Sequence, residues 1–344
     1  MERKLGINGV GNTGGSILVL MADAMSKGGH IPDVAVIHDI GRDAAQIVSE
    51  VNSGCYGLPP ILLRREDERT IAIDTLKIAV APPAGLQSMI DWSRYGVWGV
   101  IEATGAILER AENERSHIET GRAQQVVITA PSANASAKTI VYGFNEQGLQ
   151  PTDTVVDNGS CSSRACAHVL KAFLDDGHAF EGISLDILHP KTQRKRHEML
   201  EQARRGKLGA EDLVVAKRGS GSQKVLQKLF GDRLPFIQAE AIETPTLDVS
   251  RCRMAIAFRG ALTKAQVHDA LTRASRDGIL RMQQTPPTFQ HIQNDPTNSV
   301  VLEDGIMQLS STVWSIPMMF DNRYASANAA LKLTEHIAAL SAGE

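Results

Sequence analysis

A glycine-rich turn near the start of the chain constrains the fold more than any other feature of the sequence. The segment GINGVGNTGG carries Gly9, Gly11 and Gly14 in a G-x-G-x-x-G spacing. The apolar segment KLGIN before it predicts a β-strand, and the apolar segment after it predicts a helix that ends at Gly28. A strand, a tight turn and a helix in this order bring backbone N–H groups and a helix N-terminus close to a pyrophosphate. The spacing therefore predicts a dinucleotide site, although the same turn also occurs in proteins that bind nothing.

An acidic residue follows where such a site needs one. Asp39 ends the apolar segment DVAVIHD, 25 residues after Gly14. A carboxylate there can accept hydrogen bonds from the adenosine ribose and repels a 2′-phosphate, which favours NAD over NADP. His38 and Arg42 lie beside it and could accommodate that phosphate, so NADP remains an alternative. A further alternative is that Asp39 only caps the end of the strand and binds no cofactor.

The order of apolar segments predicts an α/β protein with two domains. Further strand-like segments, TLKIAVA, VWGVIEATG and AQQVVITAPS, alternate with helical ones and favour a parallel, doubly wound sheet of the Rossmann type. The pattern changes near Asp157 to longer alternating strands, such as SRCRMAIAFRG, and amphipathic helices. We therefore predict a dinucleotide-binding domain over residues 1–157, a second domain over 158–324 and a final helix over 325–344.

Composition excludes several classes of protein. The 344 residues are 42% hydrophobic and 22% charged, which is typical of a globular protein and not of a disordered or fibrous one. The formal net charge of -3 gives no reason to expect nucleic acid or an anionic membrane as partner. The four cysteines form neither a zinc pattern nor a disulfide framework, which suits a reducing compartment. The sequence carries no run of about 20 apolar residues, and we expect its first segment, MERKLGINGV, to be no signal peptide. We expect a cytoplasmic protein without a metal.

One cysteine is a candidate nucleophile. Cys161 lies in NGSCSSRAC, directly before a predicted helix, and a helix N-terminus or a nearby histidine lowers a thiol pKa. His189 ends the predicted strand ISLDILHP and is the candidate base. Cys166 falls inside the helix and is expected to pack in the core. Spacing alone leaves open whether Cys161 and His189 meet, and a half-buried structural cysteine is the alternative.

Seven segments together resemble the glyceraldehyde-3-phosphate dehydrogenase family over nearly the whole chain. In order, they are GINGVGNTGG, VIEATG, VVITAPSANASAKTIVYGFNEQ, NGSCSSRAC, LDILHPKTQ, GSGSQK and FDNRYASAN. The resemblance implies NAD, an α+β catalytic domain with an antiparallel or mixed sheet, a C-terminal helix that joins the dinucleotide domain, and a homotetramer. It also implies that the Cys161 thiolate adds to an aldehyde, that His189 is the general base, and that inorganic phosphate resolves the resulting thioester.

The same resemblance implies two sets of site residues. The cofactor set is Asn8, Gly9, Gly11, Asn12, Thr13, Asp39, Thr104, Gly105, Thr129 and Asn322. The set for the substrate and phosphate is Ser160, Ser162, Arg164, Thr192, Ser220, Gly221 and Glu243.

The chain departs from the family pattern where the substrate is expected. Glu243 stands where the family has an arginine that grips the sugar phosphate, and a carboxylate would repel that group. Arg164 replaces an asparagine near the thiol and could approach a negative substrate group. A basic segment after His189 is either a solvated helix or a replacement for the missing arginine; its cations are Arg194, Lys195, Arg196, Arg204, Arg205 and Lys207.

Three hypotheses follow. The first is a phosphorylating glyceraldehyde-3-phosphate dehydrogenase with a rebuilt phosphate site. The second is a paralogue that applies the same chemistry to another aldehyde, one without a phosphate or with a group that Glu243 could receive. The third is a non-catalytic NAD-binding protein, against which the joint presence of Cys161, His189 and Asn322 argues.

Overall fold

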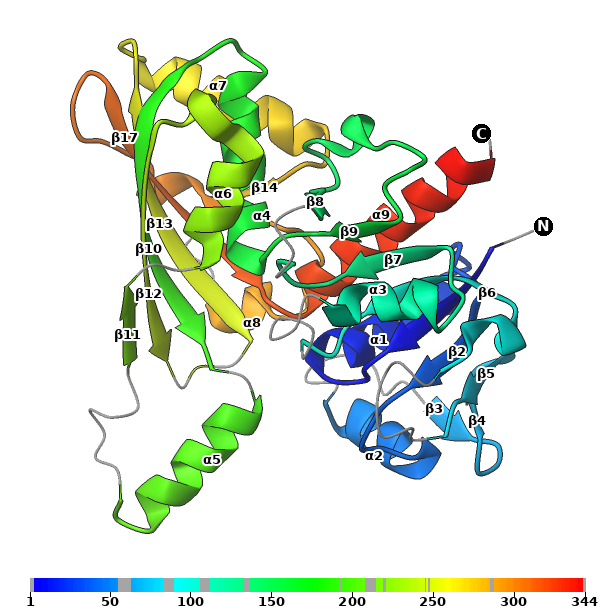
Figure 1. Ribbon diagram of the computed structural model, residues 1–344. Helices are drawn as coiled ribbons and strands as arrows, with labels where there is room; N and C mark the ends of the chain where they lie inside the picture. Colours follow the sequence, from blue (N-terminus) through cyan, green and yellow to red (C-terminus); the bar gives the residue numbers. More distant parts are fainter. Residues whose placement is uncertain are drawn as a thin grey trace. The chain divides into compact units, whose positions relative to one another are not determined.

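The computed structural model describes residues 3–54, 63–82, 90–105, 112–132, 137–191, 193–207, 215–218, 221–244, 246, 248–284 and 288–342. The chain divides into two compact units. The first is Met1–Gly159 with Ser326–Glu344, and the second is Ser160–Ala325. Each unit is built on its own sheet (Figure 1).

The first unit contains a mainly parallel sheet. In spatial order its strands are β3 (Leu63–Arg65), β4 (Thr70–Ile73), β5 (Leu76–Val80), β2 (Val34–His38), β1 (Lys4–Asn8), β6 (Val97–Glu102), β7 (Gln125–Ile128), β9 (Val155–Asp157) and β8 (Lys138–Thr139). The strands from β5 to β8 are parallel, and the strand order reverses between β1 and β6. Ligands of doubly wound sheets bind beyond the carboxyl ends of the strands at such a reversal. The antiparallel edge β3–β4–β5 was not predicted, because two of its strands are short and flanked by charged residues.

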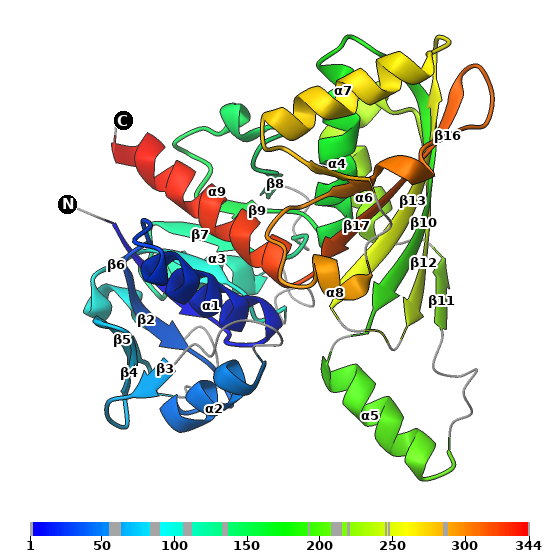
Figure 2. The same ribbon diagram turned by 180° about the vertical axis from the view of Figure 1, so that it is seen from behind.

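Helices cover both faces of this sheet. The helices are α1 (Asn12–Ser26), α2 (Ala44–Gly54), α3 (Glu112–Glu119) and α9 (Tyr324–Ala342), with short 3-10 turns η2 (Trp92–Tyr95) and η4 (Glu146–Gly148). Figure 2 shows α1 and α9 in front of the strands, and Figure 1 shows α3 in front of the opposite face. Every residue of β6 is buried, as a central strand covered on both faces requires.

The second unit contains a mixed sheet. Its strands, in spatial order, are β11 (Val215–Arg218), β12 (Phe236–Thr244), β10 (Phe180–Pro190), β13 (Val249–Phe258), β17 (Val313–Asp321), β15 (Val300–Leu302) and β14 (Arg281–Gln283), and β16 (Met307–Gln308) pairs with β17. Strands β10 and β12 are parallel, whereas β13 is antiparallel to both β10 and β17. The predicted fold class is confirmed: a Rossmann-type unit is joined to an α+β unit with a mixed sheet.

The helices α4 (Cys161–Leu174), α6 (Gly221–Phe230) and α7 (Lys264–Arg276) lie on one side of the second sheet (Figure 1). The rings of Phe173 in α4 and Phe258 in β13 pack edge to face with centroids 5.0 Å apart, so α4 is anchored on the sheet. Cys166 has no exposed surface, which confirms that it packs in the core. The remaining elements are α5 (Gln193–Arg204), α8 (Phe289–Ile292), η6 (Gly231–Arg233) and η7 (Glu303–Gly305).

No helix among the described residues is both long and apolar enough to cross a bilayer. Nor do three or more His, Cys, Asp or Glu side chains gather there as ligands for a metal ion.

Candidate functional site: a glycine turn and a thiol–imidazole pair

The three glycines of the turn in the first unit have different roles. Gly9 has a φ of +92°, and a Cβ there would lie 2.8 Å from the backbone nitrogen of Thr104. A Cβ on Gly14 would lie 1.9 Å from the carbonyl oxygen of Gly9. The start of α1 can therefore pack against the glycine-rich loop only because residue 14 has no side chain. A Cβ on Gly11 would meet no described atom within 4 Å. Protein packing therefore explains Gly9 and Gly14, whereas Gly11 borders open space.

The N-terminus of α1 lies at this glycine turn. Gly11 is the N-cap residue and supplies no side-chain hydrogen bond, and the half-buried Asn12 and Thr13 begin the helix. The first N–H groups of a helix have no partner within the helix, and together with the helix dipole they attract anions. The open space at Gly11 and this uncapped helix end fit a pyrophosphate.

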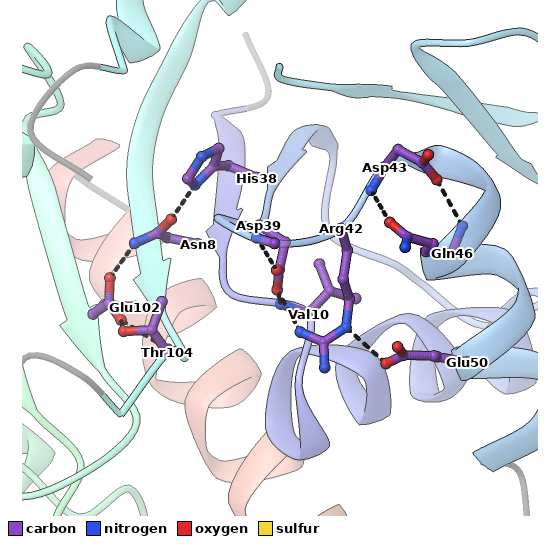
Figure 3. Close-up of polar contacts among 11 residues, drawn as sticks. Asn8, Val10, His38, Asp39, Arg42, Asp43, Gln46, Glu50, Glu102 and Thr104 are labelled. Atoms are coloured by element: carbon purple, nitrogen blue, oxygen red, sulfur yellow. Dashed lines mark hydrogen bonds and ion pairs between the residues drawn. The ribbon is translucent and has the colours of Figure 1, made fainter. Parts of the chain in front are cut away.

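Asp39 is largely engaged by the protein itself (Figure 3). Its carboxylate accepts hydrogen bonds from the backbone N–H of Val10 inside the glycine turn, at 2.9 Å, and from the N–H of Gly41, at 3.0 Å. The Arg42 guanidinium adds a third bond, of 3.0 Å from Nη1, and binds Glu50 Oε2 through Nε at 2.7 Å. Asp39 therefore ties the turn to the end of β2, and Arg42 neutralises its charge.

A buried polar network crosses the carboxyl ends of β2, β1 and β6. Asn8 faces His38 on one neighbouring strand and Glu102 on the other. Its side chain accepts from or donates to both: Oδ1 lies 2.7 Å from His38 Nδ1, and Nδ2 donates to Glu102 Oε2 at 2.5 Å. Glu102 Oε1 accepts from the backbone N–H and the hydroxyl of Thr104 (Figure 3). The network thus joins the strands on both sides of the reversal in strand order.

The donors and acceptors fix the protonation of this network. Trp92 Nε1 can only donate, and it lies 3.1 Å from His117 Nδ1, so His117 carries its proton on Nε2 and donates to Glu102 at 2.9 Å. Since Asn8 donates to Glu102 through Nδ2, its Oδ1 must accept, and His38 donates from Nδ1. His38 Nε2 is buried without a hydrogen-bond partner among the described residues, and burial lowers the pKa of His38 below 6.5. His38 is therefore neutral near pH 7.

The predicted thiol and base meet in the second unit. Cys161 is the first residue of α4, and Ser160 caps that helix by accepting the N–H of Ser163 in a capping box. Cys161 Sγ lies 3.5 Å from His189 Nε2. His189 Nδ1 lies 2.7 Å from the carbonyl oxygen of Pro190, which can only accept, so Nδ1 carries a proton and Nε2 faces the thiol. This geometry allows a proton to pass from Sγ to Nε2.

The electrostatics favour that transfer. Burial alone would raise the pKa of the Cys161 thiol, but it is outweighed by the hydrogen bond to His189, the positive charges of His189 and Arg164, and the N–H of Ser162, so the pKa falls below its usual value of 9.0. Burial alone would lower the pKa of His189, but the bond to Cys161, the thiolate charge, the Pro190 carbonyl and the Glu243 carboxylate together raise it above 6.5. Opposite shifts of this kind stabilise a thiolate–imidazolium pair.

Three hydroxyl groups gather beside the thiol. Ser222 Oγ, in the first turn of α6, lies 2.5 Å from Ser162 Oγ and 3.3 Å from Ser160 Oγ. The N-termini of α4 and α6 thus converge on one polar cluster. Gly221, the predicted phosphate residue, is exposed at the start of α6. Ser222 itself was missed, although the segment GSGSQK contains a second serine one residue after the expected pair.

Curated proteins of one family are similar to this chain along its whole length. Glyceraldehyde-3-phosphate dehydrogenase 1 of Streptomyces avermitilis is 27% identical over 344 aligned residues, which cover 97% of this chain and 98% of that protein. The plasmid-encoded glyceraldehyde-3-phosphate dehydrogenase of Cupriavidus necator is 26% identical over 95% of this chain and 96% of its own length. The enzyme of the same name from Mycobacterium leprae is 23% identical over the same shares. These similarities support the assignment of this chain as a divergent member of the glyceraldehyde-3-phosphate dehydrogenase family. No family model matches it.

The residues that depart from the glyceraldehyde-3-phosphate dehydrogenase pattern differ in their surroundings. Arg164 has no exposed surface, and its Nε donates to Asn298 Oδ1 at 3.3 Å, so in this structure it acts on the thiol through its charge rather than by meeting a solvent-accessible anion. Glu243 is half-buried and lies directly beside His189, as its partner in the parallel pair β10–β12. Its carboxylate therefore supports the positive charge of the imidazole.

Other residues expected from the family resemblance make internal contacts. Asn322 accepts from Ser250 Oγ at 3.0 Å and donates to the Asp248 carbonyl at 2.8 Å, which fixes the orientation of its amide. The Thr129 N–H donates to the Glu102 carbonyl, and Gly105 follows Thr104 with a φ of +68°. In the basic segment, the exposed Arg204 at the end of α5 and the exposed Arg205 just after it both pair with Glu201 of α5, as expected of a solvated helix. Thr192, Ser220 and the side chains of Arg194, Lys195 and Arg196 lie outside the described residues.

Proposed function

We propose that this protein is a nicotinamide-dependent aldehyde dehydrogenase that works through a thioester on Cys161. The observation that carries the proposal is the Cys161–His189 pair, with Sγ and Nε2 3.5 Å apart and the two pKa values shifted toward the charged forms. A buried cysteine that only packs in a core would have neither a histidine acceptor nor a lowered pKa.

The chain's own groups account for each proton. The Cys161 thiolate attacks the carbonyl carbon of the aldehyde, and a C–S bond forms as the C=O π electrons move to oxygen. The Cys161 N–H at the start of α4 and the His189 imidazolium stabilise this oxyanion. The His189 imidazolium protonates the oxyanion to give a thiohemiacetal, and the now neutral ring takes the hydroxyl proton back as the C=O bond re-forms and hydride leaves. Bound NAD or NADP would accept that hydride, and a thioester remains on Cys161.

Inorganic phosphate is the acyl acceptor that the surroundings favour. The hydroxyls of Ser160, Ser162 and Ser222 lie together at the N-termini of two helices, which are α4 and α6. Hydroxyl donors and helix N-termini both stabilise phosphate oxygens. Attack by a phosphate oxygen on the thioester carbon would release an acyl phosphate and return the thiolate.

Glu243 favours a second candidate, in which the aldehyde carries no phosphate. Its carboxylate lies beside His189, where it would repel a phosphorylated substrate and could receive an amine or hydroxyl group. Glyceraldehyde 3-phosphate, the substrate named in the relatives, and an unphosphorylated aldehyde thus remain the two candidates. A cytoplasmic location and a homotetramer stay predictions from the sequence.

The test is NAD and NADP reduction with phosphorylated and unphosphorylated aldehydes, with and without phosphate or arsenate. We expect turnover that Cys161→Ser abolishes and a burst of bound thioester when phosphate is omitted. Turnover of glyceraldehyde 3-phosphate alone would remove the second candidate, and turnover of unphosphorylated aldehydes alone would remove the first. Binding of the dinucleotide without turnover of any aldehyde would overturn the enzymatic proposal.

A further inference from the structure

The acid that would exclude NADP is neutralised in this chain. The Asp39 side chain is 6% exposed, and its oxygens already accept two backbone N–H groups as well as Arg42 Nη1. A free carboxylate at the end of β2 repels a ribose 2′-phosphate, whereas an arginine nearby accommodates it. Asp39 here holds the glycine turn closed through Val10, so the group that faces outward at this position is the guanidinium.

Arg42 is partly exposed, and one of its two ion pairs is with an exposed carboxylate. Its side chain is 33% exposed, and its second partner is the 56% exposed Glu50 on α2. Exposed ion pairs contribute little to stability, so an incoming phosphate can replace the Glu50 carboxylate at small cost. The planar guanidinium suits phosphate oxygens because it can donate two parallel N–H bonds.

A cavity next to Arg42 has room for a nucleoside. It has a volume of about 300 Å³ and is lined by Asp43, Ala44 and Ala45 at the start of α2, by Arg65, Glu68 and Arg69 around the β3–β4 turn, and by Val80, Ala81 and Pro82 after β5. The Ala81 N–H donates to the Ile37 carbonyl, which places this wall at the carboxyl end of β2, two residues from Asp39. The lining carries charges of both signs: the exposed cations Arg65 and Arg69 lie on the same wall as Glu68, and Asp43 lies on the wall formed by α2 and the residue before it.

We infer that the adenosine end of the dinucleotide site binds a ribose 2′-phosphate through Arg42, so that this chain accepts NADP as well as NAD. The inference rests on the proposed function only in that the glycine turn binds a dinucleotide. It replaces the expectation that Asp39 selects NAD, because the carboxylate on which that expectation depends is paired.

The experiment uses adenine nucleotide fragments, which isolate this end of the site from the thiol. Binding of adenosine 2′,5′-bisphosphate and of 5′-AMP to the whole protein is measured by calorimetry, since the two differ only in the 2′-phosphate. We expect the bisphosphate to bind at least as tightly as 5′-AMP. Arg42→Gln should weaken the bisphosphate by about 10- to 100-fold, as loss of a charged hydrogen bond does, and change 5′-AMP much less. Glu50→Gln, which frees the guanidinium, should strengthen the bisphosphate.

Arg115→Gln is the matched control, since Arg115 on α3 is an exposed arginine of the same unit in a similar pair with Glu119. It should leave both affinities unchanged. A bisphosphate that binds more than tenfold more weakly than 5′-AMP, or an Arg42→Gln variant that weakens both equally, would overturn the inference. Failure of NAD and of both fragments to bind would instead refute the dinucleotide site, so the two failures are distinguishable.

Discussion

His38 and His189 lie at the carboxyl ends of strands in the two units, yet their pKa values move in opposite directions. His38 is fully buried, and its pKa falls because burial penalises the charged ring. His189 is also strongly desolvated, but its pKa rises because a thiol that can ionise and the Glu243 carboxylate lie beside it. Burial acts on both rings in the same direction, so the partner decides the outcome.

The difference separates a structural site from a reactive one. In the first unit, Asn8 and Glu102 use their oxygens and N–H groups on each other and on His38, and the network holds the sheet edge in place. At the glycine turn itself, that unit offers a ligand mainly backbone shape. In the second unit, Cys161 Sγ and His189 Nε2 lie 3.5 Å apart, close enough for a proton to pass between them, and their pKa shifts favour a pair of opposite charges.

The largest expected effect tests the thiol–histidine pair of the second unit. His189→Asn removes the base and the positive charge beside the thiol, so cofactor reduction should fall about 10²- to 10⁴-fold. The pKa of Cys161 should rise, and the midpoint of the pH profile for alkylation by iodoacetamide should rise with it. His291→Asn, at an exposed histidine of the same unit, is the control. An unchanged alkylation midpoint would mean that His189 does not activate the thiol.

The next largest effect tests the shape of the glycine turn in the first unit. Gly14→Ala forces a Cβ against the Gly9 carbonyl, and should destabilise the protein by about 1–3 kcal/mol or more in urea unfolding. Gly11→Ala meets no described atom within 4 Å and has a compatible φ of -80°, so its cost should be limited to the poorer N-cap, about 0.5–1 kcal/mol. The same substitution should weaken NAD binding markedly in calorimetry. If Gly11→Ala binds NAD like the wild type, the open space is not the cofactor cradle.

The features of the two units differ in whether the sequence alone could predict them. The strand–turn–helix at Gly9 and the helix that begins at Cys161 follow from local patterns of apolar residues and glycines, whereas the mixed second sheet was implied by the family resemblance. Long-range pairing does not follow from local patterns, so the 3.5 Å approach of Cys161 and His189 needed the coordinates or the family resemblance. The engagement of Asp39 by Arg42 and the burial of Arg164 were also out of reach, because a sequence does not disclose where a charged side chain finds its partner.

A smaller effect tests His38 through the pH dependence of stability. Its folded pKa lies below the unfolded value of about 6.5, so between the two values the unfolded chain binds more protons. This group therefore costs stability as the pH falls below about 6.5, by at most about 1.4 kcal/mol per pH unit. His38→Gln should flatten the dependence of urea unfolding between pH 7 and pH 5, whereas His30→Gln, at an exposed histidine of the same unit, should not. Equal slopes in all three proteins would contradict a neutral buried His38.

The smallest effect concerns the carboxylate that distinguishes this chain from the family pattern. Glu243 supports the charged form of His189, so Glu243→Gln should lower the pKa of His189 and leave the ring neutral over a wider range of pH. The imidazolium stabilises the thiolate, and the pH profile of Cys161 alkylation should therefore shift upward, by less than in His189→Asn. Glu240→Gln, three residues earlier in β12, is the control. If Glu243→Gln leaves the alkylation profile unchanged but alters the preference among aldehydes, Glu243 acts on the substrate and not on the histidine. If the pH profile of alkylation shifts while the preference among aldehydes stays unchanged, the carboxylate that stands in place of the family's arginine acts on the pKa of His189.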